Sequence, residues 1–425
     1  MLMGQKDTKR TIALVTNWYP SKENPYAGVF FKEQAHVVKE YFNFVVIHLH
    51  ESQKGGFITY LLRTLIKKCY SFECINKEEN ITEYSISVAY PKGMHFLDIF
   101  ANMWYCRVKK FHIEGVGAFR SSLCHKIKKN ALGTIYRELL DDKIDIFYCV
   151  DAQGESADLQ IFSEISGKPY IVAEHAPVPW PGTTIDNVNH NAIEKANAFI
   201  AISQDKIRQV LLQNIKLPKT YLISNFVNES QFQLSQKNSG IKTFIIVAAN
   251  SFYKNYDLLI AVMDKLIDIT EVPFKIMIVG YASNKGYSQN PQYLENRIRG
   301  SKFSKCAVLI PEVPHEDIQK LYGEADAFVM TSIQEGFPVS AIEAACCGLP
   351  IFSTCCGGVE DYVTEKIGRI LPIWDADAFA QTLKEYLEEK IIFDKNYIRE
   401  RIVELYGREA FIKKFVECFM ETIYS

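Results

Sequence analysis

No run of this 425-residue sequence approaches the length that a membrane-spanning helix needs. Such a helix takes about 18 consecutive apolar residues. The sequence opens with the polar stretch MLMGQKDTKR, and the apolar run that follows, Thr11–Thr16, is too short for the core of a signal peptide. We therefore expect a cytoplasmic chain that does not cross a membrane.

An excess of either charge sign is also missing. The 48 Lys and Arg residues nearly balance the 50 Asp and Glu residues, which leaves a net charge of −2. A protein that binds nucleic acid over a large surface carries a clear positive excess. We expect no nucleic-acid partner, although the balance is still compatible with a locally basic patch.

Cysteine spacings that bind metal are absent as well. None of the 11 cysteines forms a Cys-x-x-Cys pair, and the closest groupings are Cys346-Cys347 and Cys355-Cys356. Because a free cysteine packs like a small apolar residue, we expect these pairs to fill a core rather than to bind zinc. The remaining composition, 48% hydrophobic and 23% charged, is that of a globular protein of two or three domains.

The most informative stretch of the chain runs from Ala327 to Asp361. A polar turn lies between a buried strand and a short helix, and a second buried strand follows the helix. The four predicted segments are Ala327–Met330, Thr331–Phe337, Val339–Cys347 and Ile351–Ser353. In such a unit the turn lies at the carboxyl end of a strand, which is where α/β sheets bind their ligands.

Two carboxylates bracket this turn and helix. Glu335 lies in the turn and Glu343 inside the helix, with seven residues between them. The backbone amides of residues 336–340 begin the helix, where unpaired N–H groups attract an anion such as a phosphate. An ionised Glu343 has two acceptor oxygens and could accept both hydroxyls of a ribose diol. Two surface glutamates on a helix are the alternative interpretation.

The residues around the two glutamates resemble a known family. EGFPVSAIEAACCGLPIFST, followed by a Gly-Gly turn, closely resembles the nucleotide-sugar site of the retaining glycosyltransferases of family 4, which have the GT-B fold. In that family the first glutamate contacts the donor sugar and the second contacts the ribose. The resemblance assigns those roles to Glu335 and Glu343, and it counts Gly336 and Phe337 among the donor-binding residues.

Two further segments of the second half resemble the same family. In NSFYKNYDLL, which begins at Asn250, Lys254 matches a lysine that holds the donor diphosphate in the family, and Asn250 is counted as donor-binding. The family's arginine position falls on Ala249. PEVPHEDIQKLYGEADAFVM resembles a segment whose loop backbone faces the nucleotide base, which here implies Glu312 and Val313.

The first half resembles the family in fewer places. Thr11–Thr16, a loop, a helix from Val29 to about Glu40 and a strand at Phe44–Ile47 predict the start of a Rossmann-like domain. Gly28 stands where the family uses glycine to let the backbone approach the sugar and phosphate. The sequence AEHAP resembles the family's T-E-H-G and implies a site role for His175 at the end of a strand.

Two interpretations stay open for residues 51–140. Residues 55–70 show an amphipathic helical pattern, and Phe96–Lys129 interleaves aromatic side chains with lysine and arginine. A basic, aromatic surface suits an anionic membrane or a lipid-diphosphate acceptor. Helices packed on the sheet with a solvated basic face would give the same pattern.

The resemblance implies an α/β protein of the GT-B fold, with two Rossmann-like domains whose parallel sheets face a central cleft. We expect an N-terminal acceptor domain at residues 1–228, a linker at 229–242 and a nucleotide-sugar domain at 243–406. Residues 407–425 would form a helix that crosses back to the first domain. Segment 229–242 is rich in Gln, Ser and Asn, as linkers are.

The implied activity is retaining transfer of a hexosyl unit from a nucleoside-diphosphate sugar to a glycan or lipid-linked acceptor, as in the synthesis of bacterial-type surface polysaccharide. Glu335, Lys254 and His175 would act in catalysis. We expect no cofactor and no essential metal, because no Asp-x-Asp follows a predicted strand; Asp375 and Asp377 lie where a helix is predicted to begin. The chain would be cytoplasmic, with a possible peripheral contact to an anionic membrane.

Two other functions remain compatible with the sequence. A nucleotide-sugar 2-epimerase can share the fold, although the pair Glu335 and Glu343 together with Lys254 argues against it. A catalytically inactive nucleotide- or sugar-binding protein is favoured by Ala249, by the altered loop at Gly280 and by the lack of histidine after Val150.

Overall fold

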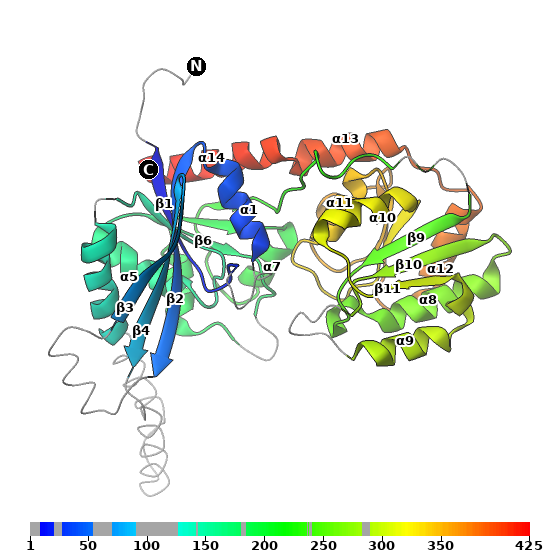
Figure 1. Ribbon diagram of the computed structural model, residues 1–425, viewed down its shortest axis with the longest axis horizontal. Coiled ribbons are helices and arrows are strands. Elements are labelled where there is room, and N and C mark those ends of the chain that lie inside the picture. The colour runs from blue at the N-terminus through cyan, green and yellow to red at the C-terminus, as the bar shows by residue number, and fades with distance from the viewer. Residues whose placement is uncertain are drawn as a thin grey trace, which may run out of the picture.

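The computed structural model describes residues 9–20, 28–53, 70–90, 126–141, 143–179, 184–235, 237, 240–282 and 290–425. Within these residues the chain forms two α/β domains, which lie side by side in Figure 1. Residues 55–69 of the predicted amphipathic helix and most of the basic region 96–129 lie outside the described residues. No helix in the described part of the chain combines the length and the apolar character that crossing a bilayer requires.

The first domain is built on an eight-stranded sheet with the order β3-β4-β2-β1-β5-β6-β7-β8. Every neighbouring pair is parallel except β3 and β4, which are antiparallel. The strands are β1 (Arg10–Val15), β2 (Phe42–Gln53), β3 (Tyr70–Glu78), β4 (Ile81–Tyr90), β5 (Ile146–Cys149), β6 (Tyr170–Glu174), β7 (Ala198–Ala201) and β8 (Thr220–Leu222). Its helices include α1 (Val29–Val38), α5 (Ser156–Ser166), α6 (Asn187–Glu194) and α7 (Gln204–Leu211).

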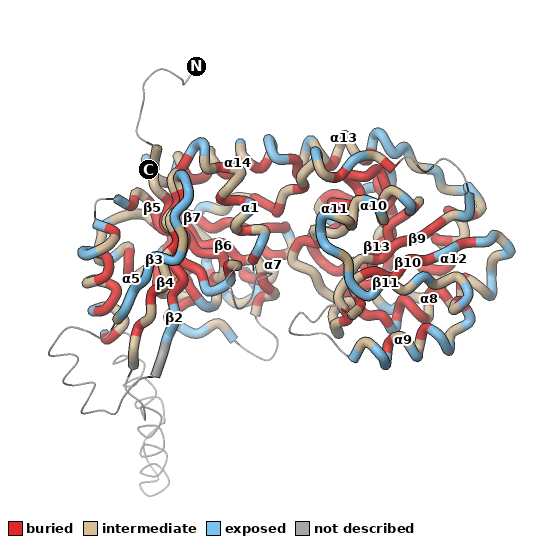
Figure 2. The backbone as a smooth tube through the Cα atoms, in the orientation of Figure 1, coloured by how far each residue is buried: buried red, intermediate tan, exposed pale blue. Residues whose placement is uncertain are grey.

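The second domain is built on a six-stranded, fully parallel sheet with the order β11-β10-β9-β12-β13-β14. Its strands are β9 (Lys242–Val247), β10 (Phe274–Val279), β11 (Ala307–Ile310), β12 (Ala327–Met330), β13 (Ile351–Thr354) and β14 (Gly368–Leu371). The helices that cover it are α8 (Tyr256–Ile269), α9 (Pro291–Arg299), α10 (Ile318–Glu324), α11 (Val339–Cys346), α12 (Ala376–Leu387) and α13 (Lys395–Tyr406). The central strands of both sheets are covered on their two faces and are almost wholly buried, whereas the edge strand β3 is largely exposed and the edge strands β8 and β11 are partly exposed (Figure 2).

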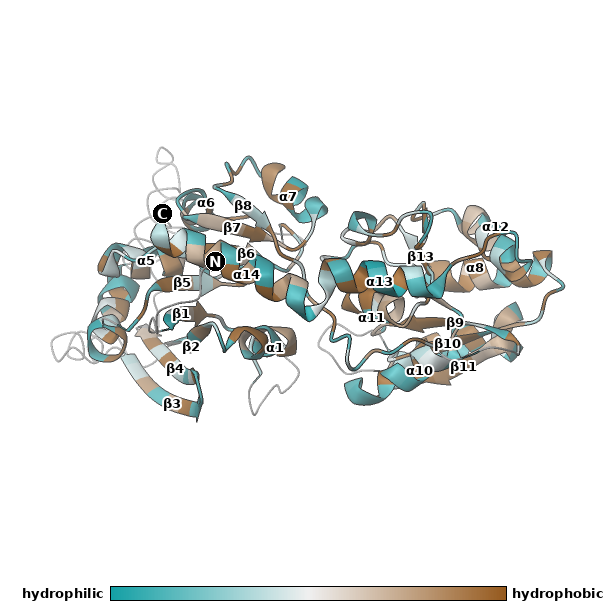
Figure 3. Cartoon of the chain, turned by 90° about the horizontal axis from the view of Figure 1, so that it is seen from above, coloured by the Kyte–Doolittle hydropathy of each residue, from teal (hydrophilic) through white to brown (hydrophobic). Residues whose placement is uncertain are grey.

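The last helix, α14 (Arg408–Tyr424), belongs by its packing to the first domain. Its aromatic side chains Phe411, Phe415 and Phe419 are buried against the first sheet, and Phe415 and Phe419 contact Phe42 and Tyr148. Seen from above, α13 lies over the second domain and α14 continues over the first (Figure 3). The chain therefore passes between the domains twice.

The segment predicted as a linker is not free of contacts. Phe232 is buried in the core of the second domain, and Arg399 on α13 donates hydrogen bonds to the carbonyl oxygens of Phe232 and Glu229. The Ser235 hydroxyl donates to the carbonyl of Gly323 at 2.9 Å. Residues 229–235 are thus packed onto the second domain.

Two local features differ from the sequence-based expectation. The strands β3 and β4 were not predicted, because β3 is an exposed antiparallel edge strand whose position depends on pairing rather than on a buried apolar run. On α1 the buried face includes Phe31, Gln34, Ala35 and Val38. Phe30 and Val37, two further apolar residues of this helix, are only partly buried and line a cavity between the domains.

Candidate active site

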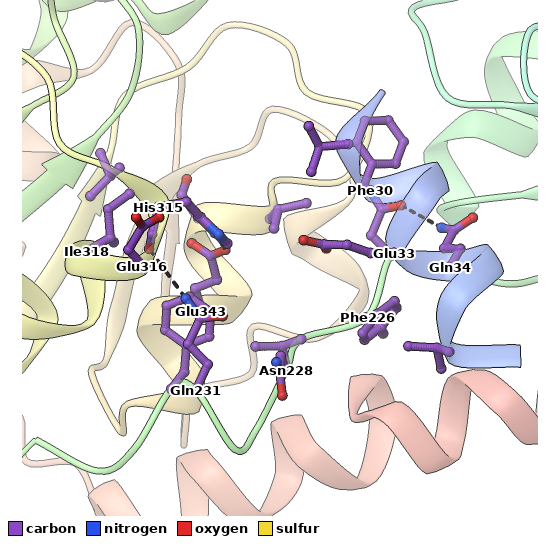
Figure 4. A pocket seen from close by; sticks show the side chains of 18 of the residues that line it. Phe30, Glu33, Gln34, Phe226, Asn228, Gln231, His315, Glu316, Ile318 and Glu343 are labelled. Atoms are coloured by element: carbon purple, nitrogen blue, oxygen red, sulfur yellow. Dashed lines mark hydrogen bonds and ion pairs between the residues drawn. The ribbon is translucent and has the colours of Figure 1, made fainter. Parts of the chain in front are cut away.

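The two domains enclose a cavity of about 1180 Å³. The first domain contributes Trp18, Gly28 and the outer side of α1, and the second contributes residues 312–318 and the start of α11. The floor is formed where the chain crosses between domains, at residues 225–232 and at Arg408. Figure 4 shows side chains from both domains pointing into this space. Of the predicted site residues, Gly28, Glu312, Val313 and Glu343 line it.

Gly28 begins helix α1 at the edge of the cavity. Its φ angle of 56° lies in the left-handed region, and a Cβ atom there would come within 2.1 Å of the carbonyl oxygen of Trp18. A side chain at this position would push the loop or the helix aside. Glycine therefore lets the backbone and α1 lie directly against the cavity, which is the geometric property expected of Gly28.

Glu343 is held inside the second domain with its carboxylate at the cavity wall. The side chain lies on α11 and is 5% exposed. His315 Nε2 lies 2.7 Å from Oε1, and Tyr322 Oη lies 3.3 Å from Oε2. Because α11 starts after β12 and residue 315 follows β11, two loops at the carboxyl edge of the same sheet bring the pair together.

Lys254 and Glu335 form an ion pair of 2.6 Å. Lys254 ends the short turn after β9 and Glu335 lies in the turn after β12. The two strands are neighbours in the sheet, so residues 81 positions apart meet at its carboxyl edge. Ser332 Oγ donates to the same Glu335 oxygen at 2.6 Å. The pair is partly open to solvent, with 27% of the lysine and 12% of the glutamate side chain exposed.

Gly336 brings this ion pair against the first domain. A Cβ atom on Gly336 would lie 2.8 Å from the carbonyl oxygen of His175 and 3.1 Å from Ile202. The next contact along the interface is polar, because the backbone N–H of Gln204 at the start of α7 donates to Asp361 at 2.8 Å. Residues 175 and 335 are therefore close in the fold, on opposite sides of a direct contact between the two domains.

His175 is a partly buried, uncharged imidazole. Burial and the nearby positive charge of Lys206 lower the pKa of His175 to about 3, so the ring is neutral at pH 7. Its ring packs against Phe30 and Phe31, with centroids 5.7 and 4.7 Å away. Nδ1 is buried without a hydrogen-bond partner. A neutral ring of this kind can accept or donate a hydrogen bond but does not supply positive charge.

Two predicted donor-binding side chains lie away from the cavity. Asn250 is 2% exposed, and its Nδ2 lies 3.5 Å from the carbonyl oxygen of Asn290. The ring of Phe337 is packed in the core between Tyr362 and Tyr406. Neither side chain lines the cavity. What residue 337 offers at the site is its backbone, in the turn that leads into α11.

Other residues of the cavity were not predicted from the sequence. His315 contacts Glu343, and Glu33 extends from α1 of the first domain toward both of them (Figure 4). His315 is part of the PEVPHED segment and could have been singled out there. Glu33 carries no local signal, because it reaches the site only through the docking of the two domains.

Comparison with known proteins agrees with this geometry. Residues 227–402 match the family model described as glycosyl transferases group 1. A D-inositol 3-phosphate glycosyltransferase of Corynebacterium urealyticum is 29% identical over 120 residues, 28% of each chain. The amylovoran biosynthesis glycosyltransferase AmsK of Erwinia amylovora is 30% identical over 105 residues, 23% of this chain and 26% of that one. The matched part thus spans less than a third of these relatives.

Likeness in fold extends over the whole chain. The structure of Anabaena HepE in complex with UDP superposes with a TM-score of 0.64 at 13% identity and covers 97% of this chain and 100% of that one. Two parallel α/β domains of this kind define the GT-B fold. The family model matches the segment that carries Lys254, Glu335 and Glu343, and we conclude that the chain has the GT-B fold and that its second domain is similar to the glycosyl transferases group 1 family.

Proposed function

We propose that this protein transfers a hexosyl unit from a nucleoside-diphosphate sugar to a glycan or lipid-linked acceptor, with retention at the anomeric carbon. The observation that carries the proposal is the ion pair of Lys254 and Glu335, held beside the start of α11 and opposite His175. The match of residues 227–402 to the family model of glycosyl transferases group 1 supports it independently.

The donor would lie along the carboxyl edge of the second sheet. Glu343 in the cavity would accept the ribose hydroxyls, and the diphosphate would meet Lys254 and the backbone amides at the start of α11. The leaving group is a diphosphate whose negative charge grows as the glycosidic bond breaks. A fixed cation and oriented N–H groups at that point favour the transition state over the ground state.

The ion pair would open when the donor binds. Without a ligand the charge of Lys254 is balanced by Glu335, which also accepts from Ser332. A diphosphate brings more negative charge than one carboxylate and would take Lys254 as its partner. Glu335 would then be free to accept hydrogen bonds from the hydroxyls of the sugar, with the neutral His175 on the opposite wall.

Metal independence is part of the proposal and has a simple test. Within the described ranges no three His, Cys, Asp or Glu side chains are grouped as metal ligands are. Lys254 and the amides of α11 would supply the positive charge that a metal ion supplies in other transferases. Activity that survives dialysis against a chelator is expected, and loss that is restored by Mg²⁺ or Mn²⁺ would contradict this point.

A role in surface polysaccharide synthesis, on the cytoplasmic side of a membrane, completes the proposal. AmsK, to which this chain is similar, is named for amylovoran biosynthesis. Membrane contact would come from the basic region 96–129, most of which lies outside the described residues. Co-sedimentation with anionic but not neutral vesicles, weakening with salt, is the expected result; binding to neither would return this region to a solvated face.

The first experiment is a thermal-shift panel of uridine, guanosine and adenosine diphosphates and their sugars. A ligand at 100 times its Kd adds about 2.7 kcal/mol of stability, so the correct base should stand out. Transfer is then assayed with the selected donor and membrane or glycan acceptors. Binding without turnover would favour a catalytically inactive binding protein. The absence of the family's arginine at Ala249 is consistent with that alternative. Epimerised donor sugar would identify the 2-epimerase instead.

A further inference from the structure

Glu33 is an acidic side chain of the first domain that lines the cavity and faces the wall formed by the second domain. It lies on the outer side of α1, one turn after Phe30, and is exposed to the cavity. Figure 4 shows it directed toward Glu343 and His315. The neighbouring Gln34 is buried and donates to Asn225 Oδ1 at 3.2 Å, which anchors α1 to the segment that crosses between the domains.

The charges around this end of the cavity are mostly negative. Four glutamates line the cavity, and the cationic or titratable groups that line it with them are one arginine and two histidines: Glu33, Glu312, Glu316 and Glu343, then Arg408, His36 and His315. Partial burial and the negative charge of Glu343 raise the pKa of Glu33, while His315 lowers it. Such a surface repels a diphosphate but suits a ligand that donates hydrogen bonds.

A ribose diol offers two such donors on adjacent carbon atoms. One carboxylate can accept both, but two carboxylates that face each other can each accept one, and each then makes a charge-assisted hydrogen bond. Glu343 stands on the second domain and Glu33 on the first. A ligand held between them relieves the repulsion of the two acids and joins the two walls of the cleft.

We propose that Glu33 and Glu343 grip the ribose of the donor from opposite domains, each accepting a hydrogen bond from one of its two hydroxyls. This rests on the proposed function, because it assumes a nucleotide in the cavity. Glu33 is then a ribose-specificity residue, and the diphosphate points away from it, toward Lys254.

The test compares ribonucleotides with their 2′-deoxy and 3′-deoxy counterparts. Using the diphosphate that binds best among UDP, GDP and ADP, affinity is measured by calorimetry for the natural protein and for Glu33→Ala and Glu33→Gln. Glu33 is exposed, so neither change removes core packing. Glu40→Gln is the matched control, since Glu40 is also exposed, lies just after the same helix and does not line the cavity.

For the natural protein, each deoxynucleotide should bind about tenfold more weakly than the ribonucleotide, because a hydrogen bond to a charged acceptor is lost. Glu33→Ala should weaken the ribonucleotide about tenfold and abolish the penalty for one deoxy analogue while keeping the other. Glu33→Gln, which retains one acceptor oxygen, should lie between. Glu40→Gln should match the natural protein throughout.

The outcomes separate the two proposals. If no nucleoside diphosphate binds the natural protein, the proposed function fails, and the role of Glu33 fails with it. If nucleotides bind but Glu33→Ala keeps both deoxy penalties, the proposed function stands and the assignment of Glu33 is overturned. A weakening of the ribonucleotide and of both deoxy analogues by the same factor would show that Glu33 only supports the wall, which also overturns it.

Discussion

The carboxyl edge of the second sheet holds an ion pair, whereas the carboxyl edge of the first sheet holds a buried carboxyl group with a raised pKa. In the second domain, Lys254 and Glu335 pair partly in the open. In the first domain, Glu155 is 3% exposed and accepts from the backbone N–H of Asn17 at 2.6 Å, with Oε2 buried and unpartnered. Burial and the nearby Asp151 raise the pKa of Glu155 to about 8. The second domain thus has a partly exposed ion pair at its edge, whereas the raised pKa of Glu155 keeps this carboxyl group protonated at pH 7 inside the first domain.

This difference predicts that the strongest effect on activity comes from the second edge. Lys254→Met keeps the aliphatic stem and removes the cation, so packing stays close to intact. We expect kcat and kcat/KM to fall together by on the order of 10²–10³, because charge on the departing diphosphate is left unbalanced. Steady-state transfer kinetics measure it. Lys265→Met, an exposed lysine of α8, is the control; a rise in KM alone would mean that Lys254 only holds the ground state.

The first edge predicts an effect on stability rather than on turnover. The folded pKa of Glu155 is about 8 and the unfolded value is near 4.5, so the folded state binds an extra proton between these pH values. Glu155 therefore contributes stability that is lost as pH rises from 5 to 8. Glu155→Gln should remove that loss, on the order of 3 kcal/mol, as seen by denaturant unfolding at several pH values.

Glu164→Gln is the control for Glu155→Gln, because Glu164 lies on the exposed side of α5, the helix that begins directly after Glu155. It should follow the natural pH profile. If Glu155→Gln followed it too, the carboxyl group would be ionised in the folded protein, and the contrast between the two edges would be lost.

The proposed contact of Glu343 with the ribose predicts an intermediate effect. Glu343→Gln keeps the size of the side chain but turns one acceptor into a donor. Nucleotide affinity should weaken by about 1–3 kcal/mol in calorimetric titration, with kcat less affected. Glu324→Gln, exposed at the end of α10, is the comparison variant. Unchanged affinity in a folded Glu343 variant would remove this residue from the ribose site.

The smallest expected effect concerns the contact between the domains. Asp361 caps the start of α7 across the interface, whereas Asp375 caps α12 within its own domain. Asp361→Asn should loosen the interface by about 0.5–1 kcal/mol and weaken nucleotide binding two- to fivefold, as measured by titration. Asp375→Asn should leave binding unchanged. Equal effects of both variants would mean that the interface contact does not bear on the site.

The two domains also differ in how much the sequence predicts. The strand, turn, helix and strand between residues 327 and 354 occur in the structure as β12, the turn to residue 337, α11 and β13. Each of these has a local cause: a short apolar run, Pro338 before the helix, or Gly348 after it. Lys254 was placed by resemblance, and its meeting with Glu335 follows from adjacent parallel strands.

What the sequence does not predict depends on contacts between distant parts of the chain. Strand β3 joins the sheet by its antiparallel pairing with β4. Glu33 lines the cavity because α1 faces the second domain. Phe337 belongs to the motif that resembles the donor site, yet its ring is packed between Tyr362 and Tyr406. A motif indicates which segment is near the ligand, but packing decides which of its atoms face it.

The two passages of the chain between the domains lie against each other. Val227 and Gly407 form a backbone bridge, and the N–H of Val227 donates to the carbonyl oxygen of Tyr406 at 2.8 Å. The two chain crossings, at Val227 and at Gly407, are therefore held together at one point between the domains. We therefore expect any opening between the domains to be a rotation about this point, which lies at the floor of the cavity. We expect such a rotation to move the residues of the cavity floor least and to move Gly336 and His175 further apart.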